Sequence, residues 1–147
     1  MSTCIDVANY FLRCPEYSDP SDAISNMKLQ KLLYFAQGHA LAILGHPLFD
    51  EDFEAWPHGP VIPSIYQRYK QYKGDAIVPP QSVDLKSFKP DEKALLEQVW
   101  LTYGGYSAWG LSNLSHVSMP WKTHKESGGT IAKDEMCAYF ATLNETA

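Results

Sequence analysis

Apolar residues recur at helical spacing between residues 26 and 44, and this is the strongest pattern in the chain. The positions that share one face are Leu29, Leu32, Leu33, Ala36, Ala40, Ile43 and Leu44. Separations of three and four residues place them along one side of a helix. Further bulky side chains lie elsewhere on the circumference, at Met27, Tyr34, Phe35 and Leu41. The pattern therefore predicts a central, mostly buried helix over 26–44.

Polar residues are few in this segment, and they leave little surface for water. Among them are Lys28, Gln30, Lys31 and Gln37. We expect these four to supply the polar surface of the helix. Gly45 and Pro47 follow in the order expected of a C-terminal cap and a stop.

Weaker periodic runs predict further helices on both sides of the central one. They cover 5–12, 62–74, 91–103, a short stretch beginning at 107, and 136–143. Pro15 should stop the first, because proline lacks the amide that a helix interior needs. Ser107 is a plausible N-cap, and Gly104 with Gly105 should end the helix before it. The total is about six helices.

The remaining segments predict turns and one short strand. FDEDFEAW, residues 49–56, mixes apolar and acidic residues and could form a strand. Pro57-His58-Gly59-Pro60 is a rigid turn in which only the glycine is free to adopt a positive φ. Residues 75–90 hold three prolines and predict an irregular crossing, and Pro120-Trp121 should open another turn. The fold class expected is mostly α (α+β), with residues 1–147 forming one compact domain.

Composition narrows the classes of function. The 147 residues carry 12 Lys and Arg against 17 Asp and Glu, a net charge of -5, so an electrostatic grip on nucleic acid is not expected. Three scattered cysteines argue against a disulfide framework and favour a reducing compartment. There is no stretch of about 18 apolar residues and no signal-peptide pattern. We expect a cytoplasmic protein without a membrane partner.

Tests for catalytic or metal chemistry give no specific motif. No two ligands share metal-binding spacing, so neither a metal nor a cofactor is predicted. Cys4, Cys14 and Cys137 are formal candidates for a nucleophile, but each fits better as a small apolar residue. An acidic cluster before Trp56 could serve a hydrolase, although such a run is usually a solvated face. Its members are Asp50, Glu51, Asp52 and Glu54. We expect no enzyme activity.

Aromatic residues are unusually frequent, with 4 Trp, 9 Tyr and 6 Phe. Most must lie in the core, but tryptophans in turns can be exposed and act as anchors of protein interfaces. Trp56, Trp109 and Trp121 lie in or beside turns. The interpretation that the sequence favours for each one is a half-buried tryptophan that holds a loop against the core.

Several ordered motifs resemble one family along nearly the whole chain. The first block comprises Lys28-Leu29-Gln30-Lys31-Leu32-Leu33-Tyr34, Gly38, Leu48-Phe49, Glu54-Ala55-Trp56, Gly59-Pro60-Val61 and Tyr66. The second comprises Tyr106-Ser107-Ala108-Trp109-Gly110-Leu111-Ser112 and Pro120-Trp121, and Ile131 to Phe140 resembles the end. Together they resemble the Panacea domain, the family of SocA-like antitoxins and phage-associated proteins. His58 departs from the lysine or aromatic residue that relatives often carry in the turn.

The resemblance implies an antitoxin that binds and neutralises a cognate toxin encoded nearby, without catalysis. It leaves two other roles open: an adaptor that presents the toxin to an AAA+ protease, or a phage-encoded protein that binds a host factor. All three require an exposed binding surface. The residues expected to form part of it are Trp56, Pro57, His58, Gly59, Pro60, Trp109 and Trp121.

Overall fold

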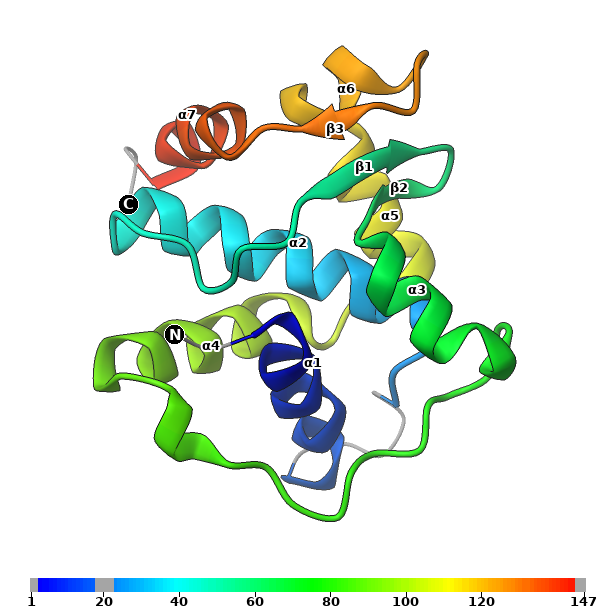
Figure 1. Ribbon diagram of the computed structural model, residues 1–147, viewed down its shortest axis with the longest axis vertical. Helices are drawn as coiled ribbons and strands as arrows, with labels where there is room; N and C mark the ends of the chain where they lie inside the picture. Colours follow the sequence, from blue (N-terminus) through cyan, green and yellow to red (C-terminus); the bar gives the residue numbers. More distant parts are fainter. Residues whose placement is uncertain (1–2, 18–22, 145–147) are drawn as a thin grey trace.

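Helix α2, Asn26–Ile43, runs through the middle of the molecule (Figure 1). The computed structural model describes residues 3–17 and 23–144. Helices α1 (Cys4–Arg13) and α4 (Pro90–Tyr103) lie on one side of α2, and α7 (Lys133–Asn144) lies on the other with the small sheet. The described residues contain seven α-helices, where the sequence predicted about six. The mostly α class with a small β element is confirmed.

The ends of α2 follow the sequence signals. Ser25 accepts a hydrogen bond from the Lys28 amide and caps the N-terminus. At the other end Leu44 is the last residue with helical geometry, and Gly45 follows with a φ of 79°. Gly45 therefore allows the chain to leave the helix in the left-handed conformation that glycine adopts at low cost.

The polar residues of α2 correct one expectation. Lys28, Gln30, Lys31 and Gln37 do not form its polar surface, because all four are buried. Gln37 shows why this is possible: its side chain accepts from the Leu48 amide and donates to the Phe49 carbonyl. Buried backbone groups need partners, and α2 provides them to the segments that cross it.

A three-stranded antiparallel sheet with the order β2-β1-β3 lies on the side of α2 opposite α1 and α4 (Figure 1). Strand β1 is Phe53–Trp56, shorter than the segment 49–56 predicted. β2 (Gly59–Val61) and β3 (Thr130–Ile131) were not predicted, since runs of three and two residues carry no periodicity. β1 and β2 form a hairpin with Trp56 opposite Gly59.

Two further expectations need correction. The helix expected over 62–74 spans only Pro63–Tyr69 (α3), with Lys70–Tyr72 continuing as a 3₁₀ turn, and Pro60 before it lies in β2. Pro120-Trp121 does not open a turn; both residues belong to the first turn of α6, Met119–His124. Proline fits there because the first amides of a helix have no intrahelical partner.

The other helices follow the predicted runs. α1 ends before Pro15 and a 3₁₀ turn continues it over Cys14–Tyr17. α5 (Ala108–His116) begins with Ser107 as its N-cap, as predicted, and the crossing over 75–90 contains only a short 3₁₀ turn at Leu85–Ser87. α7 packs closely on α2: a Cβ at Gly38 would overlap the ring of Phe140.

Candidate partner-binding surface

The turn that joins β1 to β2 projects from the sheet beside α3 and α5. Gly59 has a φ of 124°, which confirms the predicted positive φ and is a conformation that other residues rarely adopt. A Cβ at Gly59 would lie 2.6 Å from Lys31 Cε and 2.6 Å from Ser115 Oγ. The turn can thus approach α2 and α5 this closely only because residue 59 has no side chain.

Four hydrogen bonds fix the backbone of this turn from three helices. Lys31 Nζ on α2 donates to the Pro60 carbonyl at 3.1 Å, and Gln30 Oε1 accepts from the Ile62 amide at 2.9 Å. Ser112 Oγ on α5 donates to the His58 carbonyl at 2.6 Å. Trp121 Nε1 on α6 donates to the Trp56 carbonyl at 2.8 Å. The turn is therefore held in one conformation before any partner arrives.

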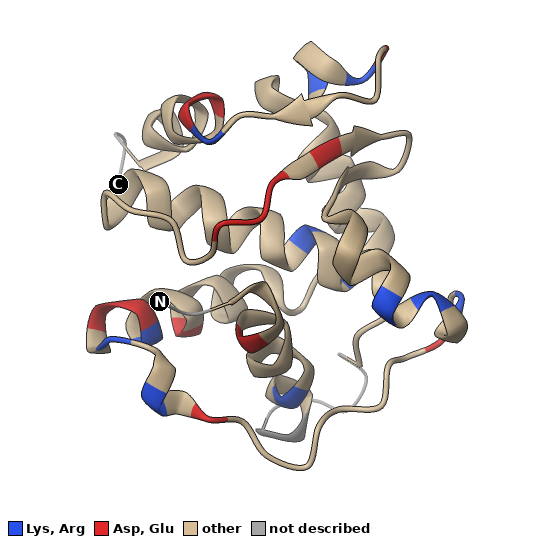
Figure 2. Ribbon diagram, viewed as in Figure 1, with Lys and Arg blue, Asp and Glu red and all other residues tan. Residues whose placement is uncertain are grey.

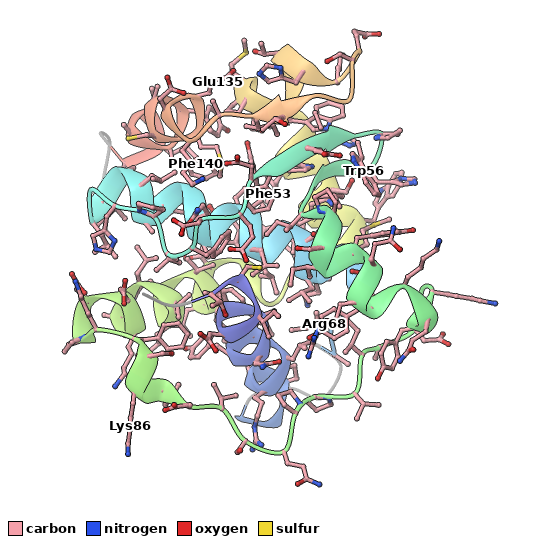
Figure 3. All side chains as sticks on the ribbon, viewed as in Figure 1. Phe53, Trp56, Arg68, Lys86, Glu135 and Phe140 are labelled. Atoms are coloured by element: carbon pink, nitrogen blue, oxygen red, sulfur yellow. The ribbon has the colours of Figure 1, made fainter. Side chains whose placement is uncertain are left out.

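Trp56 lies half-buried on the outer face of the hairpin (Figure 3). Its indole Nε1 donates to Glu54 Oε1 at 2.9 Å. Its ring packs edge-on against Tyr66 of α3, with centroids 5.1 Å apart. Trp56 therefore offers part of one ring face to solvent while its polar atom is already satisfied.

Pro57 and His58 form the exposed tip of the turn, whereas Gly59 and Pro60 are buried beneath it. Trp109 on α5 is 72% exposed, the largest exposed fraction among the big apolar side chains described. It lies three residues before Ser112, which holds His58, and residues at that spacing are neighbours on a helix. Trp109 therefore lies about one helical turn from the residue that holds the tip.

Trp121 plays the other role that the sequence left open. It is 8% exposed, and its ring stacks on His116 of α5 with centroids 4.2 Å apart. Since its indole also holds the Trp56 carbonyl, Trp121 supports the turn from below and has little surface exposed. Gly59 and Pro60 are also supporting residues, because both are buried beneath the tip.

Two further exposed apolar residues, which have no signal in the sequence, lie where α5 ends and α6 begins. Val117, 60% exposed, is the C-cap residue of α5. Met119, 58% exposed, begins α6 directly afterwards. Neither has a sequence signal, because a single apolar residue near a helix end is compatible with burial. With the tip and Trp109 they form what we call the turn face: Trp56, Pro57, His58, Trp109, Val117 and Met119.

Buried titratable groups underlie the turn face. Burial lowers the pKa of Lys31 from 10.5 to about 7, since the amine is 1% exposed. Burial also lowers the pKa of His116; the backbone of His58 opposes this shift, and the charge of Lys31 adds to it. Among the described residues, His116 Nε2 is buried without a hydrogen-bond partner. Neutral forms of both groups suit the docked turn best.

The other candidates for chemistry have structural roles in the described part of the chain. Burial raises the pKa of both Cys4 and Cys14 to about 12, which keeps these thiols protonated and unreactive. Asp52 pairs with Lys133 at 2.8 Å, and Glu54 accepts from Trp56. The acids before and within β1 form the surface strip seen in Figure 2. No group of three His, Cys, Asp or Glu could hold a metal among the residues described.

Comparison with known proteins places this architecture in a family. The model of the family described as "Antitoxin SocA-like, Panacea domain" matches residues 29–122, which include most of α2, the hairpin, α5 and the start of α6. The chain belongs to this family. It is also similar to the protein Antitoxin SocA from Caulobacter vibrioides (strain NA1000 / CB15N), with 36% identity over 125 residues. The match covers 73% of this chain and 63% of that relative, so the chain spans less than two thirds of the relative's length.

The resemblance stated from the motifs is thereby confirmed at the level of the family. No solved structure matches the chain. Among the described residues, no helix combines the length and apolar character needed to span a membrane.

Proposed function

We propose that this protein is an antitoxin that neutralises a toxin by binding it through the turn face. Family membership and the similarity to Antitoxin SocA support the antitoxin role. The observation that supports this surface is the exposed Trp109 beside a turn whose backbone is fixed by three helices. A rigid surface loses little conformational entropy when a partner binds.

The chemistry of the turn face suits a protein partner. Trp is the residue most often found at the energetic centre of protein interfaces, and Met adapts to irregular partner surfaces. His58 and the second ring face of Trp56 add polar and aromatic contacts at the edge. A stable complex needs about 800 Å² from each partner, so the turn face would form the centre of a larger contact.

Co-expression with the product of the neighbouring gene tests the antitoxin role. We expect that product to arrest growth when expressed alone and to be harmless together with this protein. Absence of toxicity, or toxicity that this protein does not relieve, would refute the role. Measuring the toxin's half-life in the same cells separates neutralisation by binding, which leaves it unchanged, from delivery to a protease, which shortens it.

The role of the turn face needs a separate comparison. Trp109→Ala combined with His58→Ala should abolish rescue in this assay, because both side chains project from the face and support little of the core. Leu101→Ala is the matched control, since Leu101 is 68% exposed but lies on α4, on the other side of α2. Equal rescue by the double variant and the control would show that the toxin binds elsewhere.

A further inference from the structure

Lys31 occupies an unusual position for a lysine. It is 1% exposed in the centre of the molecule, and its Nζ donates to the Pro60 carbonyl at 3.1 Å. Its Cε packs directly beneath Gly59. A lysine this deeply buried normally pairs with a carboxylate, because a lone charge is costly to remove from water.

No carboxylate compensates Lys31 among the described residues, and burial is the only cause of its low pKa. The elements packed around it contribute few titratable groups. α5 contributes His116, on which the charge of Lys31 acts, and the turn contributes His58, whose charge acts on His116. β2 contributes only Gly59, Pro60 and Val61, which carry no charge. The surroundings therefore favour a neutral amine.

The turn is the element that covers Lys31. Gly59 and Pro60 lie over its amine end and pair with Trp56 and Ala55 of β1. Lys31 holds the Pro60 carbonyl, while Ser112 and Trp121 hold the neighbouring carbonyls of His58 and Trp56. A neutral amine can still donate one hydrogen bond to the Pro60 carbonyl. An ammonium in the same place has three donors, and two of them would need water as a partner. Because the turn covers the amine, water reaches the ammonium when the turn moves outward.

We propose that the turn Trp56–Pro60 is a proton-controlled latch, docked while the buried Lys31 amine is neutral and released more readily when that amine is protonated. Lys31 then acts as a positioning residue for the turn face. The buried Nε2 of His116, on α5, has no hydrogen-bond partner and also favours the neutral state, since protonating it would place a second charge under the turn. The consequence for toxin binding rests on the proposed function: the complex should weaken as pH falls from 8 to 6.

Amide hydrogen exchange on the free protein tests the latch without any toxin. The Ile62 amide donates to Gln30 Oε1 two residues beyond Pro60 and reports opening of the turn. If Lys31 has a pKa of about 7 when covered and 10.5 when exposed to water, the opening constant is about tenfold larger at pH 6 than at pH 8. The Leu48 amide, held by Gln37 Oε1 on the same helix, is the internal control and should show no such change.

Two variants assign the effect to Lys31. Lys31→Met should remove the tenfold pH dependence at Ile62, because the apolar side chain fills the site and cannot be protonated. Lys28→Met is the matched control: Lys28 is also buried on α2 but donates to the Gly104 carbonyl, so the dependence should persist. Both variants are measured with His58→Gln, which removes the imidazole carried by the turn itself.

The latch is refuted if opening at Ile62 does not change between pH 6 and 8, or if the change survives in Lys31→Met. Should Lys31→Met not fold, the Nζ resonance of Lys31 in the wild-type protein decides instead. A midpoint near 7 supports the latch, and a midpoint near 10.5 refutes it. Failure of toxin rescue, with the exchange results as expected, would refute the proposed function alone.

Discussion

Gly59 is subject to two separate constraints, and each alone would favour glycine. Its φ of 124° strains any residue with a Cβ, and the space where that Cβ would lie is filled by Lys31 and Ser115. The first constraint concerns the backbone and the second concerns packing, so they can be measured apart.

Gly59→Ala should destabilise the protein by about 2 to 4 kcal/mol, from backbone strain together with overpacking. Gly45→Ala separates the two effects, because Gly45 has a φ of 79° but nothing within 4 Å of its Cβ position. We expect about 1 to 2 kcal/mol there, from the backbone alone. Urea unfolding measures both. Equal losses in the two variants would show that Lys31 and Ser115 do not confine residue 59.

At the level of single residues, the sequence indicated Gly59 correctly because a glycine between two prolines has few explanations. It did not distinguish Trp109 from Trp121. Both lie near a helix start, and only the tertiary contact with the Trp56 carbonyl makes one of them a buried support. Lys31 was assigned to the surface, since no sequence pattern shows that the fold places a backbone carbonyl within hydrogen-bond distance of a lysine in the core.

Helix α2 supplies hydrogen bonds to the irregular segments around it, in addition to filling the core. Asn26 donates to the Tyr66 carbonyl, Gln30 holds Ile62, and Gln37 holds both Leu48 and Phe49. This explains how segments without regular structure can cross a buried helix without leaving their backbone groups unsatisfied.

Replacing one of these glutamines should lower the free energy of unfolding by more than the loss of its packing contacts would suggest. Gln37→Leu leaves the buried Leu48 amide and Phe49 carbonyl without their partner, a loss of about 2 to 6 kcal/mol at ~1 to 3 kcal/mol for each group. Gln67→Leu on the exposed side of α3 is the control and should change stability by less than ~0.5 kcal/mol. Chemical denaturation compares them. A small loss for Gln37→Leu would mean that water replaces the amide.

The elements themselves were largely predictable where the pattern was long. α2, α4 and α7 bury residues at steady helical spacing, so their existence followed from the sequence. β2 and β3 did not, because strands of three and two residues form only when β1 lies between them. The place of the candidate site depends on those short strands, which is why its residues could be suggested but not assembled from the sequence.

For the molecule as a whole, the buried Lys31 predicts a rise in stability with pH. Its folded pKa of about 7 lies below the unfolded value of 10.5, so between these values the unfolded chain binds more protons and raising the pH favours folding. The slope is about 1.4 kcal/mol per pH unit above pH 7. Above about pH 9 the raised pKa values of Cys4 and Cys14 act in the opposite direction, because the unfolded chain then loses protons first.

Urea unfolding at pH 7, 8 and 9 measures this slope. Lys31→Met should remove the rise in this window and leave the decline above it. A wild-type free energy of unfolding that is flat from pH 7 to 9 would show that the amine is solvated in the folded protein.

The hairpin of β1 and β2 lies on the side of α2 away from α1 and α4 (Figure 1). Trp109 contributes almost nothing to the core, so its exposure calls for another explanation, and a partner surface provides one. This is the central claim, because the antitoxin role requires a surface that binds a toxin.

Calorimetric titration of the toxin with Trp109→Ala tests that claim most directly. We predict a dissociation constant at least tenfold above the wild-type value, about 1.4 kcal/mol, with stability changed by less than ~0.5 kcal/mol. Leu101→Ala, equally exposed on α4, should bind like the wild type. Wild-type affinity in Trp109→Ala, or an equal loss in Leu101→Ala, would contradict the assignment of the turn face as the toxin-binding surface.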